Sequence, residues 1–128
     1  MVRQADGSLR VFHNVCRHRG MALATEPRQA LRSITCPRHG WSYALDGALR
    51  HTTHVVGEGQ YRCPGFEASE LGLVEVRSAR WNDFVLVNLD GRAPPLREHI
   101  APLCDLLDGI ELEGLRLIAA WQHHYPGN

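Results

Sequence analysis

Two stretches decide what this sequence can fold into: Asn14-Val15-Cys16-Arg17-His18-Arg19-Gly20-Met21 and Cys36-Pro37-Arg38-His39-Gly40-Trp41-Ser42-Tyr43. Each stretch places a cysteine, a histidine and a glycine within a few residues of one another. Seventeen residues separate His18 from Cys36, so two loops would each supply one thiolate and one imidazole. These two groups are good ligands for iron, zinc and copper. The pattern therefore predicts a metal site made of Cys16, His18, Cys36 and His39.

The four candidate ligands suit a [2Fe–2S] cluster of mixed ligation, in which two cysteines hold one iron and two histidines hold the other. Cys16 and Cys36 would then share one iron, and His18 and His39 its neighbour. A tetrahedral zinc ion is the weaker alternative, because zinc modules usually order their ligands as a cysteine pair followed by a histidine pair. Glycines at 20 and 40 suit loops whose backbone approaches a cluster closely and donates N–H groups to it.

Turn signals and short apolar runs predict a mainly β fold in the first half of the chain. Residues 9–15 and 31–35 favour strands, and each leads into one of the two cysteines. The pair Asp46-Gly47 is a strong hairpin signal, so we expect strands at 41–45 and 48–50 to pair. The polar segment 51–70, rich in glycine and proline, is typical of an irregular connection.

Three further elements are expected in the second half. Residues 73–81 and 84–89 predict a hairpin whose second strand is buried on both faces. Leucines at helical spacing between 94 and 107 predict one or two short helices, kinked or split near Pro102. Residues 115–121 favour a final strand.

The composition limits the kinds of molecule that we expect the chain to bind. Fourteen Lys and Arg balance fourteen Asp and Glu, which removes the net attraction that non-specific nucleic-acid or anionic-membrane binding needs. No apolar run approaches the roughly 20 residues that span a bilayer, and the N-terminus lacks a signal core. We therefore expect a cytoplasmic protein without nucleic-acid or membrane partners. Cys63 and Cys104 are expected to be buried or partly buried free thiols there.

Residues 14–21 and 36–49 together closely resemble the Rieske domain of ring-hydroxylating (Rieske non-haem iron) oxygenase α subunits, and the resemblance continues through 71–76 and 81–90. It implies that Cys16, His18, Cys36 and His39 are the cluster ligands and that Trp41 and Tyr43 pack around the cluster.

The same resemblance implies a Rieske-type antiparallel β-sandwich over residues 1–90, with a small cluster-binding subdomain at about 9–50. Residues 91–128 would form a helical connector and the start of a catalytic domain. Because the family pattern already runs at Met1 and its catalytic domain would begin near Asn128, we expect the chain to be a fragment truncated at both ends.

The implied function is electron relay from a reductase or ferredoxin to a mononuclear Fe(II) in the catalytic domain of a homo-oligomer. Two histidines and a carboxylate hold that iron, and the remaining histidines (His13, His51, His54, His99, His123 and His124) do not form this pattern. No catalytic residue is therefore predicted here. The alternative is a stand-alone Rieske-type ferredoxin. The substrate, and mono- versus dioxygenase chemistry, would be decided by residues outside this sequence.

Overall fold

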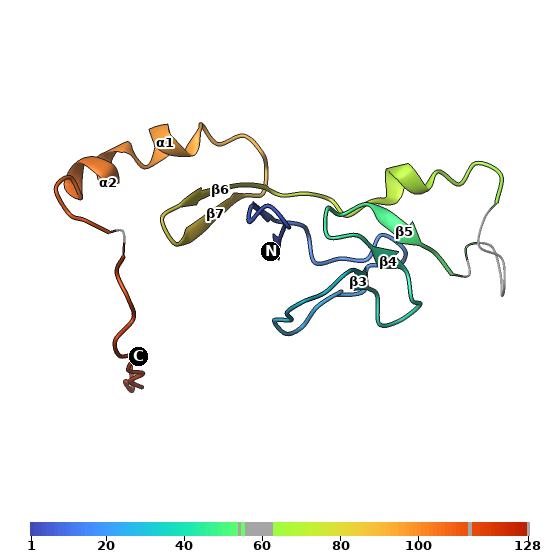
Figure 1. Cartoon of the computed structure of the whole chain (residues 1–128), viewed down its shortest axis with the longest axis horizontal. Helices are drawn as coiled ribbons and strands as arrows, with labels where there is room; N and C mark the ends of the chain where they lie inside the picture. Colours follow the sequence, from blue (N-terminus) through green and yellow to red (C-terminus); the bar gives the residue numbers. More distant parts are fainter. Residues whose placement is uncertain (54, 56–62, 113, 128) are drawn as a thin grey trace.

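The computed structural model describes residues 1–53, 55, 63–112 and 114–127. Within them, seven short strands form three antiparallel sheets, ordered β1-β2, β3-β4-β5 and β6-β7. The prediction of a mainly β chain with two short helices near the C-terminus is confirmed (Figure 1). The elements are β1 (Val2–Arg3), β2 (Leu9–Arg10), β3 (Ile34–Thr35), β4 (Ser42–Tyr43), β5 (Leu49–His51), the 3-10 helix η1 (Ala68–Leu71), β6 (Arg77–Trp81), β7 (Phe84–Asn88), α1 (Leu96–His99) and α2 (Ala101–Leu106).

Two hairpins in the first half turn in the same way. The β1–β2 turn closes with Gly7 N–H donating to the Gln4 carbonyl at 3.0 Å, and the β4–β5 turn closes with Gly47 N–H donating to Ala44 at 3.0 Å. Both glycines have a left-handed φ, +85° and +89°, which an L side chain adopts only with strain. The Asp46-Gly47 hairpin thus forms as the sequence predicts, and Asp6-Gly7 closes the β1–β2 turn in the same way.

The strand expected at 9–15 changes partner part of the way along. Leu9 and Arg10 pair with β1, whereas Phe12 bridges Glu75 on the later segment. The backbone continues this contact, because Val76 N–H donates to the Val11 carbonyl at 2.8 Å. The N-terminal hairpin is thereby joined to the chain that precedes β6.

The core of the described residues is small and lies at the predicted metal site. Six buried side chains form it: Cys16, Leu23, Cys36, Trp41, Tyr43 and Leu73. Three of these side chains are almost completely buried: Cys16 is 1% exposed, Cys36 2% and Tyr43 0%. The best-buried part of the protein is thus the part that carries the thiols.

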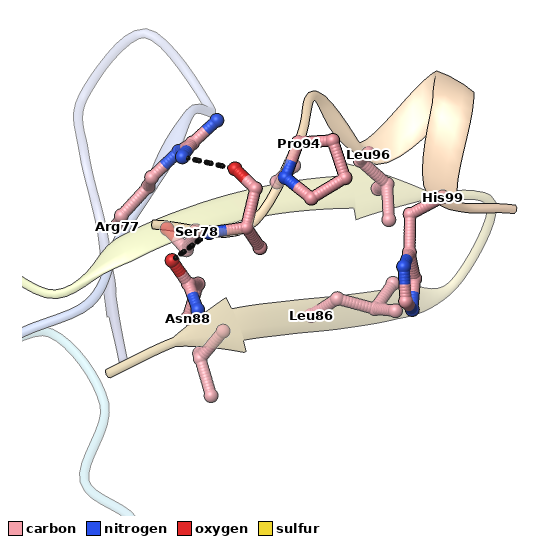
Figure 2. A pocket seen from close by; sticks show the side chains of 10 residues that line it. Arg77, Ser78, Leu86, Asn88, Pro94, Leu96 and His99 are labelled. Carbon is pink, nitrogen blue, oxygen red and sulfur yellow. Dashed lines mark hydrogen bonds between the residues drawn. The ribbon is translucent and has the colours of Figure 1, made fainter. Parts of the chain in front are cut away.

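The β6–β7 hairpin is confirmed, but the prediction that β7 is buried on both faces is wrong. Phe84 and Leu89 are 64% and 75% exposed, and among the described strands β6 and β7 pair only with each other. A groove of about 300 Å³ opens between this hairpin and α1 (Figure 2). Arg77 lies at one end of it and donates to the Ala93 carbonyl at 2.6 Å.

The C-terminal part departs from the sequence expectations in two places. The split near Pro102 is confirmed, since α1 ends at His99 and Pro102 lies in the first turn of α2, where its missing N–H costs no hydrogen bond. No strand forms over 115–121, because no partner strand lies beside it. Cys104 is exposed on α2, contrary to prediction, whereas Cys63 is partly buried.

The irregular connection expected at 51–70 falls partly on residues 54 and 56–62, which lie outside the described residues. The part of this connection that follows the undescribed residues contains η1, and its Leu71 and Phe66 side chains pack against the core. None of the helices in the described ranges is long and apolar enough to cross a membrane.

Candidate metal centre

The first predicted loop is a tight turn that follows β2. Cys16 N–H donates to the Met21 carbonyl at 2.8 Å, and Gly20 N–H donates back to the Cys16 carbonyl at 2.9 Å. Gly20 has a φ of +73°, which reverses the chain and leaves His18 at the tip. Asn14 supports the turn, because its side-chain oxygen accepts the N–H groups of Leu23 and Ala24 at 3.1 and 3.0 Å.

The second loop repeats this geometry between β3 and β4. Cys36 N–H donates to the Trp41 carbonyl at 2.7 Å, Gly40 N–H donates to Cys36 at 3.0 Å, and φ of Gly40 is +72°. The role of the two glycines is therefore conformational. Their N–H groups bond the cysteine carbonyls, and in the second turn it is the backbone N–H groups of Arg38 and His39 that point to the Cys36 sulfur.

The two thiols are buried side by side. Tyr43 Oη lies 3.3 Å from Cys16 Sγ and accepts the backbone N–H of Arg17 at 3.0 Å. Burial raises the pKa of the Cys36 thiol, but the backbone N–H groups of His39 and Arg38, a hydrogen bond with Cys16 and the Arg38 charge together hold its pKa below the ordinary value. The pocket therefore favours an anionic sulfur at Cys36.

Burial raises the pKa of the Tyr43 phenol well above its ordinary value, and its hydrogen bond with Cys16 raises it further. The phenol therefore keeps its proton throughout the physiological range. A protonated phenol next to a thiolate is a hydrogen-bond donor to that sulfur.

The two histidines also meet. Their ring centroids lie 4.8 Å apart at an interplanar angle of 69°. The Trp41 indole stacks on His18, with 4.7 Å between centroids and 7° between planes, and its Nε1 donates to the Thr53 carbonyl at 3.0 Å. Thr53 Oγ1 in turn donates to the His39 carbonyl. The His18 ring is thus stacked by a residue of the second turn, and the backbone of His39 is held by Thr53 from outside both turns.

The structure brings all four predicted ligands together as a thiol pair and an imidazole pair. Among the described residues, no group of three or more His, Cys, Asp or Glu side chains is arranged to hold one metal ion. Two buried sulfurs beside two imidazoles are the donor set that a [2Fe–2S] cluster of mixed ligation uses, with two ligands for each iron. The residues therefore fit that group.

Of the supporting residues, the sequence predicts Trp41 and Tyr43 but not Thr53. Thr53 is 14 residues from His39 along the chain and carries no local motif, so only the folded chain reveals its contact. Of the other described histidines, His51 lies on β5 and pairs with Ser42, and His123 and His124 lie in the exposed C-terminal tail; His54 lies outside the described residues.

Three comparisons place the chain among known proteins. The Rieske [2Fe-2S] domain model matches residues 1–64. The chain is 33% identical over 119 residues to the glycine betaine monooxygenase oxygenase subunit of Chromohalobacter salexigens, covering 93% of this chain and 25% of that protein. It is 33% identical over 130 residues to the carnitine monooxygenase oxygenase subunit of Escherichia coli, covering 100% and 33%. With the biphenyl dioxygenase subunit alpha of Paraburkholderia xenovorans it shares 34% over 114 residues, covering 84% and 24%.

Solved structures of Rieske oxygenases are also similar to this chain. A quaternary ammonium Rieske monooxygenase bound to γ-butyrobetaine matches with a TM-score of 0.70 and 30% identity, over 82% of this chain and 29% of that one. A naphthalene 1,2-dioxygenase bound to phenanthrene matches with a TM-score of 0.68 and 32% identity, over 82% and 23%. The chain thus spans about a quarter to a third of the length of these relatives.

Proposed function

Because this chain belongs to the Rieske [2Fe-2S] domain family, whose domain binds a [2Fe–2S] cluster, we propose that its own ligands are the four residues of the two turns. Cys16 and Cys36 would hold one iron, and His18 and His39 the other. The observation that supports this assignment is the division of the site into a buried thiol pair and an adjoining imidazole pair.

The proposed function is one-electron relay within a Rieske oxygenase. A reductase or ferredoxin would supply electrons, and a mononuclear iron outside this chain would receive them. The relatives support this reading, because monooxygenases of quaternary ammonium compounds and dioxygenases of aromatic hydrocarbons match the chain at nearly the same identity. What such different oxygenases share is the relay, whereas the substrate pocket differs.

The cluster supplies reversible one-electron storage, and the residues around it tune and orient the ligands. Tyr43 Oη and the N–H groups of Arg38 and His39 donate to the sulfur side, which stabilises negative charge there. Trp41 fixes the plane of the His18 imidazole by stacking. Neutral imidazoles in place of thiolates leave the centre less negative, which raises the reduction potential.

We also propose the division of the chain and its assembly. Residues 1–90 would form the Rieske domain, with the cluster-binding subdomain at about 9–50, and residues 91–128 a connector to a catalytic domain. Inter-subunit electron transfer has been described for a quaternary ammonium Rieske monooxygenase that matches this fold at a TM-score of 0.67 and 29% identity. The full protein of this chain would likewise be a homo-oligomer.

Reconstitution with iron and sulfide under anaerobic conditions tests the ligand assignment. The wild-type chain should hold two irons and two acid-labile sulfides, with a potential near the lower end of the Rieske range, about −150 mV. Replacing both imidazoles, His18→Cys with His39→Cys, should lower the potential toward the roughly −400 mV of four-thiolate ferredoxins.

His99→Ala, on exposed α1, is the matched control and should leave both the stoichiometry and the potential unchanged. Cys36→Ala should abolish assembly. A single zinc without sulfide, or a full cluster in the Cys36→Ala variant, would contradict the assignment.

A further inference from the structure

Thr53 contacts the second metal-centre turn from a segment that belongs to neither turn. It follows β5 and is partly buried. Its Oγ1 donates to the His39 carbonyl, and its own carbonyl accepts the Trp41 indole N–H at 3.0 Å. One residue thus binds the chain on both sides of Gly40, at a proposed ligand and at the residue that stacks on His18.

This contact distinguishes two turns whose backbones otherwise match. Gly20 and Gly40 have nearly the same φ, +73° and +72°. A Cβ on Gly40 would lie 3.8 Å from Thr53 Cγ2, whereas a Cβ on Gly20 would meet nothing within 4 Å. The second turn is therefore covered by Thr53 at its glycine, while in the described chain the first turn is open there.

Trp41 connects Thr53 to the first turn. The indole is buried and stacks on His18, with 4.7 Å between ring centroids and 7° between planes. A buried indole N–H usually has a hydrogen-bond acceptor, and the Thr53 carbonyl supplies it. Because this bond holds the plane of the indole, it also limits the plane of the imidazole stacked on it. Thr53 is therefore connected to both imidazoles, to His39 through the backbone and to His18 through the indole.

We propose that Thr53 is a positioning residue that sets the mutual orientation of the two imidazoles, whose ring centroids lie 4.8 Å apart at an interplanar angle of 69°. The inference rests on the proposed ligand assignment and adds a residue outside the ligand set. Residues that orient metal ligands by hydrogen bonds tune the centre, although they do not bind the metal. The Thr53 hydroxyl can be removed without changing a ligand.

Thr53→Val removes the hydroxyl and keeps the size of the side chain. Pulsed paramagnetic resonance of the reduced, reconstituted chain, with histidine labelled by ¹⁵N, reports how the imidazoles are oriented at the iron. We expect the histidine couplings to shift from their wild-type values. A chelator should remove the cluster about 2- to 10-fold faster, the equivalent of one lost hydrogen bond.

Two variants serve as controls for Thr53→Val. Thr53→Ser keeps the hydroxyl and should restore both the couplings and the rate of cluster loss. Thr25→Val changes an exposed threonine between the first turn and β3 in the same way, and should alter neither. A third variant, Thr53→Ala, removes the hydroxyl without placing a methyl group against the His39 carbonyl, so it provides the test if Thr53→Val does not assemble a cluster.

The possible failures are distinguishable. A wild-type chain without a [2Fe–2S] spectrum would overturn the proposed function itself. Wild-type histidine couplings in a cluster-loaded Thr53→Val or Thr53→Ala chain would overturn the positioning role alone, whatever the change in stability. Failure of both variants to hold a cluster would show that Thr53 is needed for assembly and not for orientation, which would also overturn the proposal.

Discussion

At the scale of single residues, the Tyr43 hydroxyl is a side-chain polar contact to the sulfur side of the site. It lies 3.3 Å from Cys16 Sγ and remains protonated, because burial raises its pKa. A hydrogen bond to a cluster sulfur stabilises the more negative, reduced state. The proposed cluster should therefore depend on this one hydroxyl for part of its potential.

Tyr43→Phe removes the hydroxyl and keeps the ring that fills the core. We expect the cluster to assemble and its reduction potential to fall by about 20–65 mV, the equivalent of one hydrogen bond worth roughly 0.5–1.5 kcal/mol. Protein-film voltammetry gives the value directly. Tyr125→Phe in the exposed tail is the control, and a potential equal to wild type in Tyr43→Phe would show that the hydroxyl does not act on the sulfur.

The sequence places the four proposed ligands in two local turns but reveals less of what surrounds them, for a physical reason. Cys16, His18, Cys36 and His39 are fixed by spacing within two local turns, which are readable from short motifs. The contact of Thr53 with His39 joins residues that only the folded chain brings together. Contacts of this kind leave no periodicity or spacing to detect.

At the scale of elements, the two Asp-Gly hairpins provide a matched pair of sites. Both turn glycines have a left-handed φ, but a Cβ on Gly47 would lie 2.6 Å from Phe12 Cε1, whereas a Cβ on Gly7 would meet nothing within 4 Å. The β4–β5 turn is therefore packed against the N-terminal hairpin, and the β1–β2 turn is open.

Alanine substitution of each turn glycine should separate the cost of backbone strain from the cost of displacing a packed neighbour. Gly7→Ala should cost about 1–2 kcal/mol of unfolding free energy, from the left-handed backbone alone. Gly47→Ala should cost about 1–3 kcal/mol more, because the Phe12 ring must also move. Urea unfolding of the reconstituted protein measures both, and equal losses in the two variants would argue against the Phe12 contact.

The Arg10–Glu75 ion pair ties β2 to the segment before β6. Arg10 Nε donates to Glu75 Oε1 at 2.9 Å, and Nη1 donates to the Asp46 carbonyl at 2.6 Å. The hydrogen bonds from Arg10 hold the pKa of Glu75 below its ordinary 4.5. A lowered carboxyl pKa stabilises the fold above that value, and the contribution is lost as the pH falls through the folded-state pKa.

Glu75→Gln should therefore be less stable than wild type at pH 7, by no more than about 1 kcal/mol because both partners are partly exposed. The difference should shrink below about pH 4.5, where the wild-type carboxyl takes up a proton. Unfolding curves from pH 3 to 7, roughly, record it. Asp83→Asn, which breaks the more exposed Arg80–Asp83 pair, is measured beside it as the control.

The sequence predictions of secondary structure are correct for the strands that flank a recognisable turn sequence. The hairpins around Asp46-Gly47 and Asn82-Asp83 form as expected. The predictions fail for 84–89 and 115–121, since burial and strand pairing depend on a neighbour that the segment itself does not encode. An apolar run predicts a preference for burial, but in the described chain Phe84, Val87 and Leu89 remain more than half exposed.

At the scale of the whole molecule, the core and the metal centre coincide. Two of the six buried core residues are the proposed cysteine ligands, and a third, Tyr43, contacts one of them. Because ligand binding energy contributes to folding in small metal domains, removal of the metal should loosen this region first. The β6–β7 hairpin shares none of these side chains.

Hydrogen exchange of the cluster-loaded and metal-free chains tests whether loss of the metal loosens the metal-site core more than the β6–β7 hairpin. We expect the amides of 14–24 and 34–44 to lose protection by at least about 10-fold without the cluster, and those of 77–88 to change little. Equal loss of protection in both regions would show instead that the chain unfolds as one unit.

The central claim is that two cysteines and two histidines of two matching turns hold a [2Fe–2S] cluster. Pulsed paramagnetic resonance of the reduced, reconstituted protein tests it most directly, with histidine labelled by ¹⁵N. The account predicts a reduced-state signal coupled to two histidine nitrogens, with both couplings lost when His18 and His39 are replaced together by cysteine. A signal without histidine coupling, or a protein that binds one zinc and gives no signal, would contradict it.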